Sequence, residues 1–301
     1  MRTRITGAVI RIRQVSVSTA ESPLSGVRVV TLAPNLPGPV AANRLVTLGA
    51  TVTKVEPPAG DPLAVASPDY YRLLAEGQEV RTLDLKDAAG REALESLLED
   101  ADLLITSSRP RALEKLGLAW ADLHPRHPRL SQVAVVGHAD TDADRPGHDL
   151  TYQAEAGTLS PPMMPVIPVA DLAGAERVVG DATALLFHAS RSGTGGYREV
   201  ALAQVVEDAA ASVRSGLCGP GTPLGGGLPT YGIYRTADDG WIALAAIEPH
   251  FIMRLGEELG VDPMDRDSLE GAFLRRGQDA WEQWAAERDL PLATVRPALR
   301  S

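Results

Sequence analysis

A histidine and two aspartates supply the groups needed to move a proton on and off carbon. His148 and Asp149 follow a Pro-Gly turn within the stretch from Arg145 to Tyr152, and Asp171 comes later in the chain. An imidazole and a carboxylate held near each other can serve as general base and general acid at one carbon. All three residues also have a structural interpretation, because Asp149 and Asp171 suit helix N-caps and His148 suits a turn. The elements around them decide between chemistry and capping.

Short apolar strands alternate with helical patterns over the first two thirds of the chain. We expect strands at residues 27–32, 51–55, 80–85, 102–106, 130–136 and 197–202. We expect helices at residues 40–48, 69–75, 89–99, 111–116, 150–159, 175–192 and 204–215. This alternation predicts an α/β fold with a Rossmann-like parallel sheet and helices on both faces. Ligands of such sheets bind beyond the carboxyl ends of the strands, which is where His148 falls.

The composition of the chain changes along its length and predicts two domains. A run rich in Gly and Pro separates them, and beyond it two strand-like segments flank Asp238-Asp239-Gly240, which predicts an antiparallel hairpin. Helices are expected at residues 249–259 and 278–288. The predicted divisions are a flexible N-terminal extension (1–22), a large Rossmann-like domain (23–215), a linker (216–229) and a small α+β domain (230–301).

Charge and cysteine content exclude several classes of function. The chain of 301 residues has a formal net charge of −10, which argues against nucleic acid or an anionic membrane as a partner. Its lone cysteine, Cys218, cannot form an internal disulfide, so a cytoplasmic setting is expected. No stretch reaches transmembrane length.

Metal and nicotinamide motifs are incomplete. The acidic loop at residues 140–144 imitates a calcium loop, but Arg145 stands where glycine is required and Thr151 where the closing glutamate belongs. The loop after the first strand carries Gly38 alone instead of a G-x-G-x-x-G sequence. We therefore expect no metal and no nicotinamide cofactor.

Several stretches, taken together and in order, resemble the family III CoA-transferases (CaiB/BaiF type). They are residues 24–30, Gly38-Pro39, residues 48–58, residues 83–86, Arg109-Pro110, residues 116–118, residues 144–149 and residues 168–174. The resemblance implies the fold expected above, an acyl-CoA thioester as substrate, and an interlocked homodimer. It also implies a role for Asp171, which matches the aspartate that forms covalent intermediates in the transferases and transfers a proton in the racemases.

Two features favour racemase chemistry. His148 within Gly147-His148-Asp149, and Glu248 before Pro249, resemble the pattern of the 2-methylacyl-CoA racemases. Inversion next to a thioester needs a base on one face of a planar enolate and an acid on the other. His148, oriented by Glu248, would serve one face and Asp171 the other. Backbone N–H groups at residues 172–174 would stabilise the enolate oxygen.

The groove for CoA departs from the family pattern. Arg109, Lys54 and Lys86 are candidate phosphate contacts, while Gly38 and Gly147 would let CoA approach the backbone. Against binding, Glu79 and Pro57 replace basic residues that the family usually carries, and the chain ends earlier than its relatives. Two alternatives to a racemase therefore stay open. One is a CoA-transferase that uses Asp171, and the other is a non-catalytic member that has lost CoA binding.

Overall fold

The larger part of the protein is built on a six-stranded parallel sheet with the order β3-β2-β1-β4-β5-β6. The computed structural model describes residues 22–296, so the predicted N-terminal extension lies almost entirely outside the described residues. The strands are β1 (Arg28–Thr31), β2 (Thr51–Glu56), β3 (Glu79–Thr82), β4 (Leu103–Thr106), β5 (Ser131–Val136) and β6 (Tyr197–Ala201). Every neighbouring pair in this sheet is parallel, which confirms the α/β prediction.

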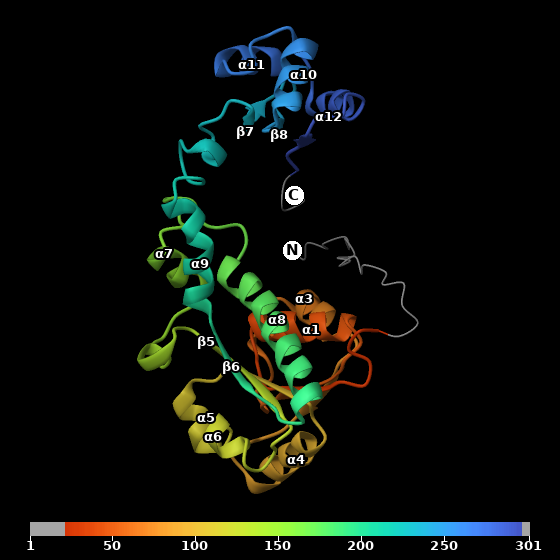
Figure 1. Cartoon of the computed structure of the whole chain (residues 1–301), viewed down its shortest axis with the longest axis vertical. Helices are drawn as coiled ribbons and strands as arrows, with labels where there is room; N and C mark the ends of the chain where they lie inside the picture. Colours follow the sequence, from red (N-terminus) through yellow and green to blue (C-terminus); the bar gives the residue numbers. More distant parts are fainter. Residues whose placement is uncertain (1–21, 297–301) are drawn as a thin grey trace, which may run out of the picture. The chain divides into compact units, whose positions relative to one another are not determined.

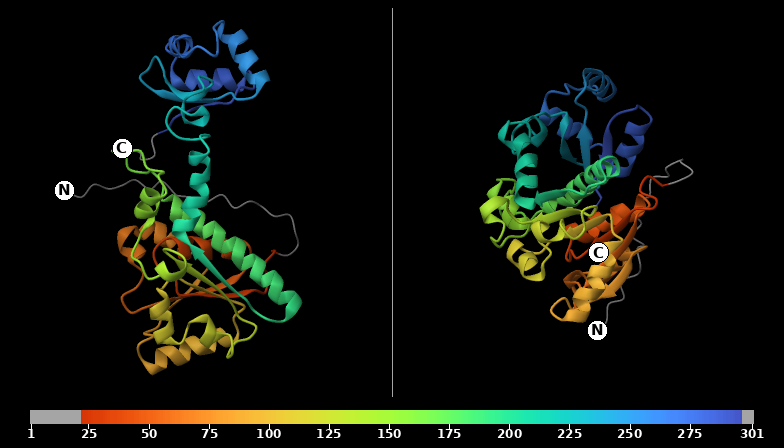
Figure 2. Two further views of the ribbon diagram at one scale, coloured as in Figure 1. Left: turned by 60° about the vertical axis from the view of Figure 1, so that its left-hand side comes forward. Right: turned by 60° about the horizontal axis from the view of Figure 1, so that its bottom comes forward.

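Helices cover both faces of this sheet (Figures 1 and 2). They are α1 (Pro37–Thr47), α2 (Pro62–Ala66), α3 (Pro68–Ala75), α4 (Ala88–Glu99), α5 (Pro110–Leu116), α6 (Trp120–Leu123), α7 (Asp149–Glu155), α8 (Val169–Ser192) and α9 (Leu202–Arg214), with a 3₁₀ turn at Asp140–Asp142.

Successive side chains of a strand point to opposite faces of the sheet, so the central strands β1 and β4 supply two cores. Val29 of β1 and Ile105 of β4 pack with α1, α8 and α9 on one face. Val30 and Leu104, their neighbours in sequence, pack with α4 and α5 on the other. Burial on both faces explains why the strands read as continuous apolar runs.

The C-terminal part of the chain forms a separate antiparallel sheet with the order β7-β8-β9. Its strands are β7 (Tyr231–Arg235), β8 (Trp241–Ala245) and β9 (Leu292–Thr294), and its helices are α10 (Pro249–Leu259), α11 (Arg266–Phe273) and α12 (Gln278–Ala286). Asp239 in the hairpin turn has a positive φ of 61°, as a tight turn requires. Tyr234, Phe273 and Trp281 form part of its buried core.

The chain divides after Asp208 into two compact units, and this division falls inside α9. Residues 216–229, which we expected to be a linker, contain turns and a short 3₁₀ helix, Pro223–Gly225. No helix within residues 22–296 has the length and apolar character needed to cross a membrane.

One boundary differs from prediction in a way that matters for the site. We expected a helix at residues 175–192, but α8 begins at Val169. Asp171 therefore lies in the first turn of a long helix. The expected helix at 150–159 is the shorter α7, which ends at Glu155.

Candidate active site

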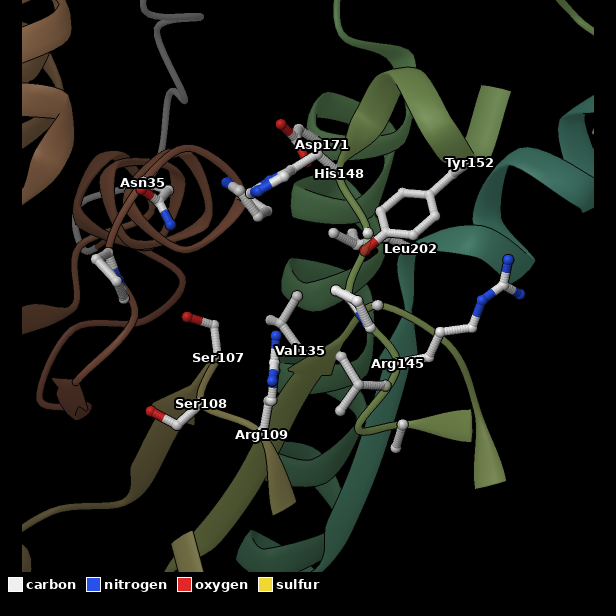
Figure 3. A pocket seen from close by; sticks show the side chains of 17 residues that line it. Asn35, Ser107, Ser108, Arg109, Val135, Arg145, His148, Tyr152, Asp171 and Leu202 are labelled. Carbon is white, nitrogen blue, oxygen red and sulfur yellow. The ribbon is translucent and has the colours of Figure 1, made fainter. Parts of the chain in front are cut away.

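A cavity opens where the carboxyl ends of the strands meet, and it contains both His148 and Asp171 (Figure 3). Its volume is about 250 Å³. The loops that follow β1 and β4 both contribute, and these strands are the neighbours at which the strand order reverses. The lining residues are Pro34, Asn35, Pro37, Ser107, Ser108, Arg109, Val135, Val136, Gly137, Ala143, Arg145, Pro146, Gly147, His148, Tyr152, Asp171 and Leu202.

His148 precedes α7, and hydrogen bonds between its backbone and the Thr151 hydroxyl hold it there. Its backbone is extended, with φ −144° and ψ 168°, at the N-cap position. Its N–H donates to Thr151 Oγ1 at 3.0 Å, and the Thr151 hydroxyl donates to the His148 carbonyl at 2.8 Å. The imidazole remains exposed and lies next to Asp171 (Figure 3). It is therefore free to meet a substrate.

Asp149 is the first residue of α7, but its side chain caps the neighbouring helix α8. Its Oδ1 accepts the N–H of Ala170 at 2.6 Å and that of Asp171 at 3.4 Å, and its Oδ2 accepts Gln153 Nε2 at 2.6 Å. Pro168, at the N-cap of α8, has no side-chain acceptor for these donors. Asp149 thus ties the first turn of α8 to α7 and fixes where Asp171 lies.

Asp171 is the titratable group most clearly tuned within the cavity. Burial raises the pKa of its carboxyl to about 6, and the negative charge of Asp149 adds to this while His148 opposes it. A carboxyl with a pKa near 6 can give or take a proton close to neutral pH, which suits a general acid or base.

Tyr152 brings a hydroxyl into the same cavity (Figure 3). A Cβ at Gly137 would lie 2.5 Å from the Tyr152 hydroxyl, and a Cβ at Gly147 would lie 2.4 Å from its ring. Both positions therefore need glycine for this ring to fit. Burial, together with the charge of Asp171, raises the pKa of Tyr152, so the hydroxyl keeps its proton and can donate it to a hydrogen bond.

The predicted backbone donors for an enolate oxygen are already engaged. Leu172 N donates to Pro168 O at 3.0 Å, and the N–H groups of Ala170 and Asp171 go to Asp149. The helix begins at Val169, earlier than expected, so residues 172–174 follow its first turn and their N–H groups are used within the helix instead of facing an enolate oxygen.

Of the predicted contacts for CoA, Arg109 and Gly147 line the cavity. Arg109 is exposed at the N-cap of α5. Gly38 is buried in α1, where a Cβ would lie 2.2 Å from the Ala33 Cβ, so its small size serves packing. Lys86 is exposed in the turn before α4.

Lys54 has a different environment from the phosphate site that we predicted. Its Nζ lies 2.6 Å from Asp61 Oδ2 and 2.8 Å from Glu56 Oε1, and its side chain is only 3% exposed. With two carboxylates around it and no access to solvent, this ammonium is not available to a phosphate, and we drop it from the CoA contacts.

Glu248 belongs to the C-terminal unit. It is exposed at the N-cap of α10. Its pairing with His148 remains a prediction.

Several cavity residues were given no role from the sequence. Ser107 and Ser108 directly follow β4, so the rule that ligands bind beyond strand ends would have indicated them. Tyr152 stands within the His148 stretch but reads as an ordinary apolar position of a helix. Asn35 has a positive φ of 68°, for which asparagine is one of the few tolerant residues.

Comparisons with known proteins agree with this fold. The family model of CoA-transferase family III matches residues 24–298. A succinate–glutarate CoA-transferase of Agrobacterium fabrum is 31% identical, the match covering 81% of this chain and 68% of the relative. Human alpha-methylacyl-CoA racemase is 32% identical, with 79% of this chain and 65% of the relative covered.

A solved structure has a similar fold. The crystal structure of the Mycobacterium tuberculosis protein Rv3272 superposes with a TM-score of 0.78 at 27% identity, and it covers 92% of this chain and 85% of that one. The match of the family model over nearly the whole chain shows that this protein belongs to CoA-transferase family III.

Proposed function

We propose that this protein is an acyl-CoA racemase or epimerase that inverts the carbon next to the thioester, with 2-methylacyl-CoA as the substrate class. One group removes the proton from this carbon, and the electrons of the C–H bond move into the thioester carbonyl to give a planar enolate. A second group, on the opposite face, returns a proton to the same carbon. The thioester bond stays intact throughout, so no covalent enzyme intermediate forms.

The observation that carries this proposal is the pair His148 and Asp171 at one cavity. Burial raises the pKa of the Asp171 carboxyl to about 6, so this group can give or take a proton near neutral pH. An imidazole and a carboxyl on opposite faces of one carbon let the reaction run in both directions, because each acts as base for one enantiomer and as acid for the other.

An enolate also needs a hydrogen-bond donor for its oxygen. Tyr152 supplies one within the cavity, and its raised pKa keeps it protonated beside a developing negative charge. We propose that the Tyr152 hydroxyl, instead of the backbone N–H groups of α8, donates the hydrogen bond to the enolate oxygen.

Support for CoA binding comes from Arg109, which lines the cavity and is exposed. Arg145 also lines the cavity, but its guanidinium is paired with the Glu155 carboxylate. The unfavourable charge expected at Glu79 is offset, since Arg81 Nε lies 2.8 Å from Glu79 Oε1. In this proposal Arg109 and Lys86 contact phosphates, Glu248 orients His148, and the protein acts as a cytoplasmic homodimer.

A second candidate is a CoA-transferase, favoured by relatives such as the succinate–glutarate CoA-transferase. Here the Asp171 carboxylate attacks the thioester carbonyl, the C–S bond breaks, and CoA leaves as a thiolate while an acyl-aspartyl anhydride forms. With a pKa of about 6, this carboxylate is mostly ionised at neutral pH and so able to attack.

Deuterium exchange separates the two reactions. In heavy water, a racemase places deuterium on the carbon next to the thioester of a 2-methylacyl-CoA, and His148→Ala should lower this rate by about 100-fold or more. His188→Ala is the control, because His188 is exposed on α8 and does not line the cavity. A transferase gives no exchange and instead forms an adduct at Asp171 that hydroxylamine releases.

A third hypothesis is a family member that has lost CoA binding and catalyses neither reaction. Calorimetry of coenzyme A binding to the native protein tests it. No binding would contradict both catalytic proposals and leave a non-catalytic member of the family.

A further inference from the structure

A buried cluster of charges lies beneath the loop that follows β1. Lys54 of β2 contacts Glu56 and Asp61, and the side chains of the three are 3%, 10% and 0% exposed. The Tyr71 hydroxyl donates to Glu56 Oε1 at 2.8 Å, and Lys54 Nζ lies 4.6 Å from the centre of the Tyr71 ring. Buried charges are retained only when they are paired and hydrogen-bonded, so this cluster is a built feature.

Asp61 extends the cluster to the backbone. While its Oδ2 faces Lys54, its Oδ1 accepts the N–H of Asn35 at 3.0 Å and the N–H of Leu63 at 2.9 Å. The second bond caps α2. The first reaches across to the loop between β1 and α1. One carboxylate therefore joins three segments of the chain.

The loop that Asp61 holds is a wall of the active-site cavity. Pro34, Asn35 and Pro37 line that cavity, and Figure 3 shows Asn35 there. Proline has no N–H, so the backbone of residues 34–37 has few donors with which to fasten itself, and Asn35 provides one of them. Asn35 also has a positive φ of 68°, which is unfavourable for a residue with a side chain unless its surroundings hold it.

We propose that Asp61, itself held by Lys54, is a positioning residue that fixes this cavity wall in the shape that receives the acyl-CoA. The inference rests on the proposed use of the cavity for acyl-CoA. Both side chains are buried, and neither lines the cavity. Their effect is on the wall, and it therefore appears in substrate binding more than in proton transfer.

Two double variants, similar to each other in side-chain volume and equal in charge, test whether Asp61 positions the cavity wall. Lys54→Met with Asp61→Asn removes the ion pair but keeps an oxygen that accepts the Asn35 and Leu63 N–H groups. Lys54→Met with Asp61→Leu has nearly the same volume and the same charge but no acceptor. Neither leaves an unpaired lysine, and in both Glu56 keeps the Tyr71 hydroxyl.

We expect the leucine variant to bind coenzyme A about tenfold more weakly than the asparagine variant, since a lost buried hydrogen bond is worth about that factor. In the deuterium exchange assay, its KM should rise by about tenfold, while kcat stays within about threefold. Equal binding and equal KM in two folded variants would overturn the inference. So would a loss confined to kcat.

Hydrogen exchange tests the anchor independently of activity and of the variants. In the native protein, the Asn35 amide should exchange at least tenfold more slowly than the Asp69 amide, an exposed residue at the start of α3. An unprotected Asn35 amide would overturn the inference. Failure of native protein to bind coenzyme A, with Asn35 protected, would instead contradict the proposed function alone.

Discussion

Replacing Asp171 by asparagine should make the protein more stable while it removes activity. Burial raises the pKa of this carboxyl from its usual 3.8 to about 6, and the neighbouring charge of Asp149 contributes. When folding raises the pKa of a carboxyl, ionisation of that carboxyl lowers the free energy of unfolding. The reason is that the charged form is more stable in the unfolded chain than in the folded protein. Asparagine has the same shape and no charge, so it removes this cost.

The structure gives both the size and the pH window of the effect. A shift from 3.8 to about 6 corresponds to about 3 kcal/mol at about 1.36 kcal/mol per pKa unit. The side chain is partly exposed, so water screens part of this, and we expect a gain of about 1–3 kcal/mol in the free energy of unfolding. The cost is present in full above about pH 6, shrinks as the folded carboxyl takes up its proton, and vanishes below about pH 4.

Urea unfolding of native and variant protein at about pH 7.5 and about pH 4.5 measures this difference. Asp181→Asn is the control for the loss of a carboxylate, because Asp181 lies on the same helix and its side chain makes no hydrogen bond or ion pair among residues 22–296. The gain in stability at the higher pH should be specific to Asp171→Asn. An Asp171→Asn variant that is no more stable than native protein at the higher pH would refute the reasoning. So would a gain of equal size at both pH values.

Three further predictions concern the groups around Asp171. Tyr152→Phe should keep the fold, because the ring still packs, but lower kcat in the deuterium exchange assay by about 10- to 100-fold; an unchanged kcat would exclude the hydroxyl as the donor. Gly147→Ala should lower the free energy of unfolding by about 1–3 kcal/mol, since the new Cβ would lie 2.4 Å from the Tyr152 ring; urea unfolding of Gly180→Ala, an open position on α8, is the control. Asp149→Ala should cost about 1 kcal/mol through the lost cap, and in a carboxyl titration by NMR it should lower the pKa of Asp171; an unchanged pKa would show that burial acts alone.

The centre of the sheet could be predicted from the sequence because its strands are buried on both faces. β1 and β4 appear as short apolar runs between turn residues, whereas β3 at the edge of the sheet is exposed along its length. The start of α8 could not be predicted in this way. Pro168 precedes the helix and offers no side-chain cap, and the cap comes from Asp149, which is distant in sequence.

The burial of Lys54 differs from the prediction, although the alternation of residues in β2 indicates it. In β2, Lys54 stands two residues after Val52, so alternation places both on the same face of the sheet, and both are buried. Lysine is so rarely buried that composition pointed to the surface instead. The partner that makes its burial possible, Asp61, lies beyond a Pro-Gly segment whose path the sequence does not define.

Asp149 connects the stability of the fold to the chemistry of the site. By accepting the N–H groups at the start of α8, it fixes the helix turn that carries Asp171. The charge that makes it a good acceptor also raises the pKa of Asp171. A neutral cap would hold the helix almost as well but would leave Asp171 a weaker base. The same carboxylate therefore stabilises the helix and, together with burial, destabilises the charge on Asp171, which raises the pKa of that carboxyl to about 6.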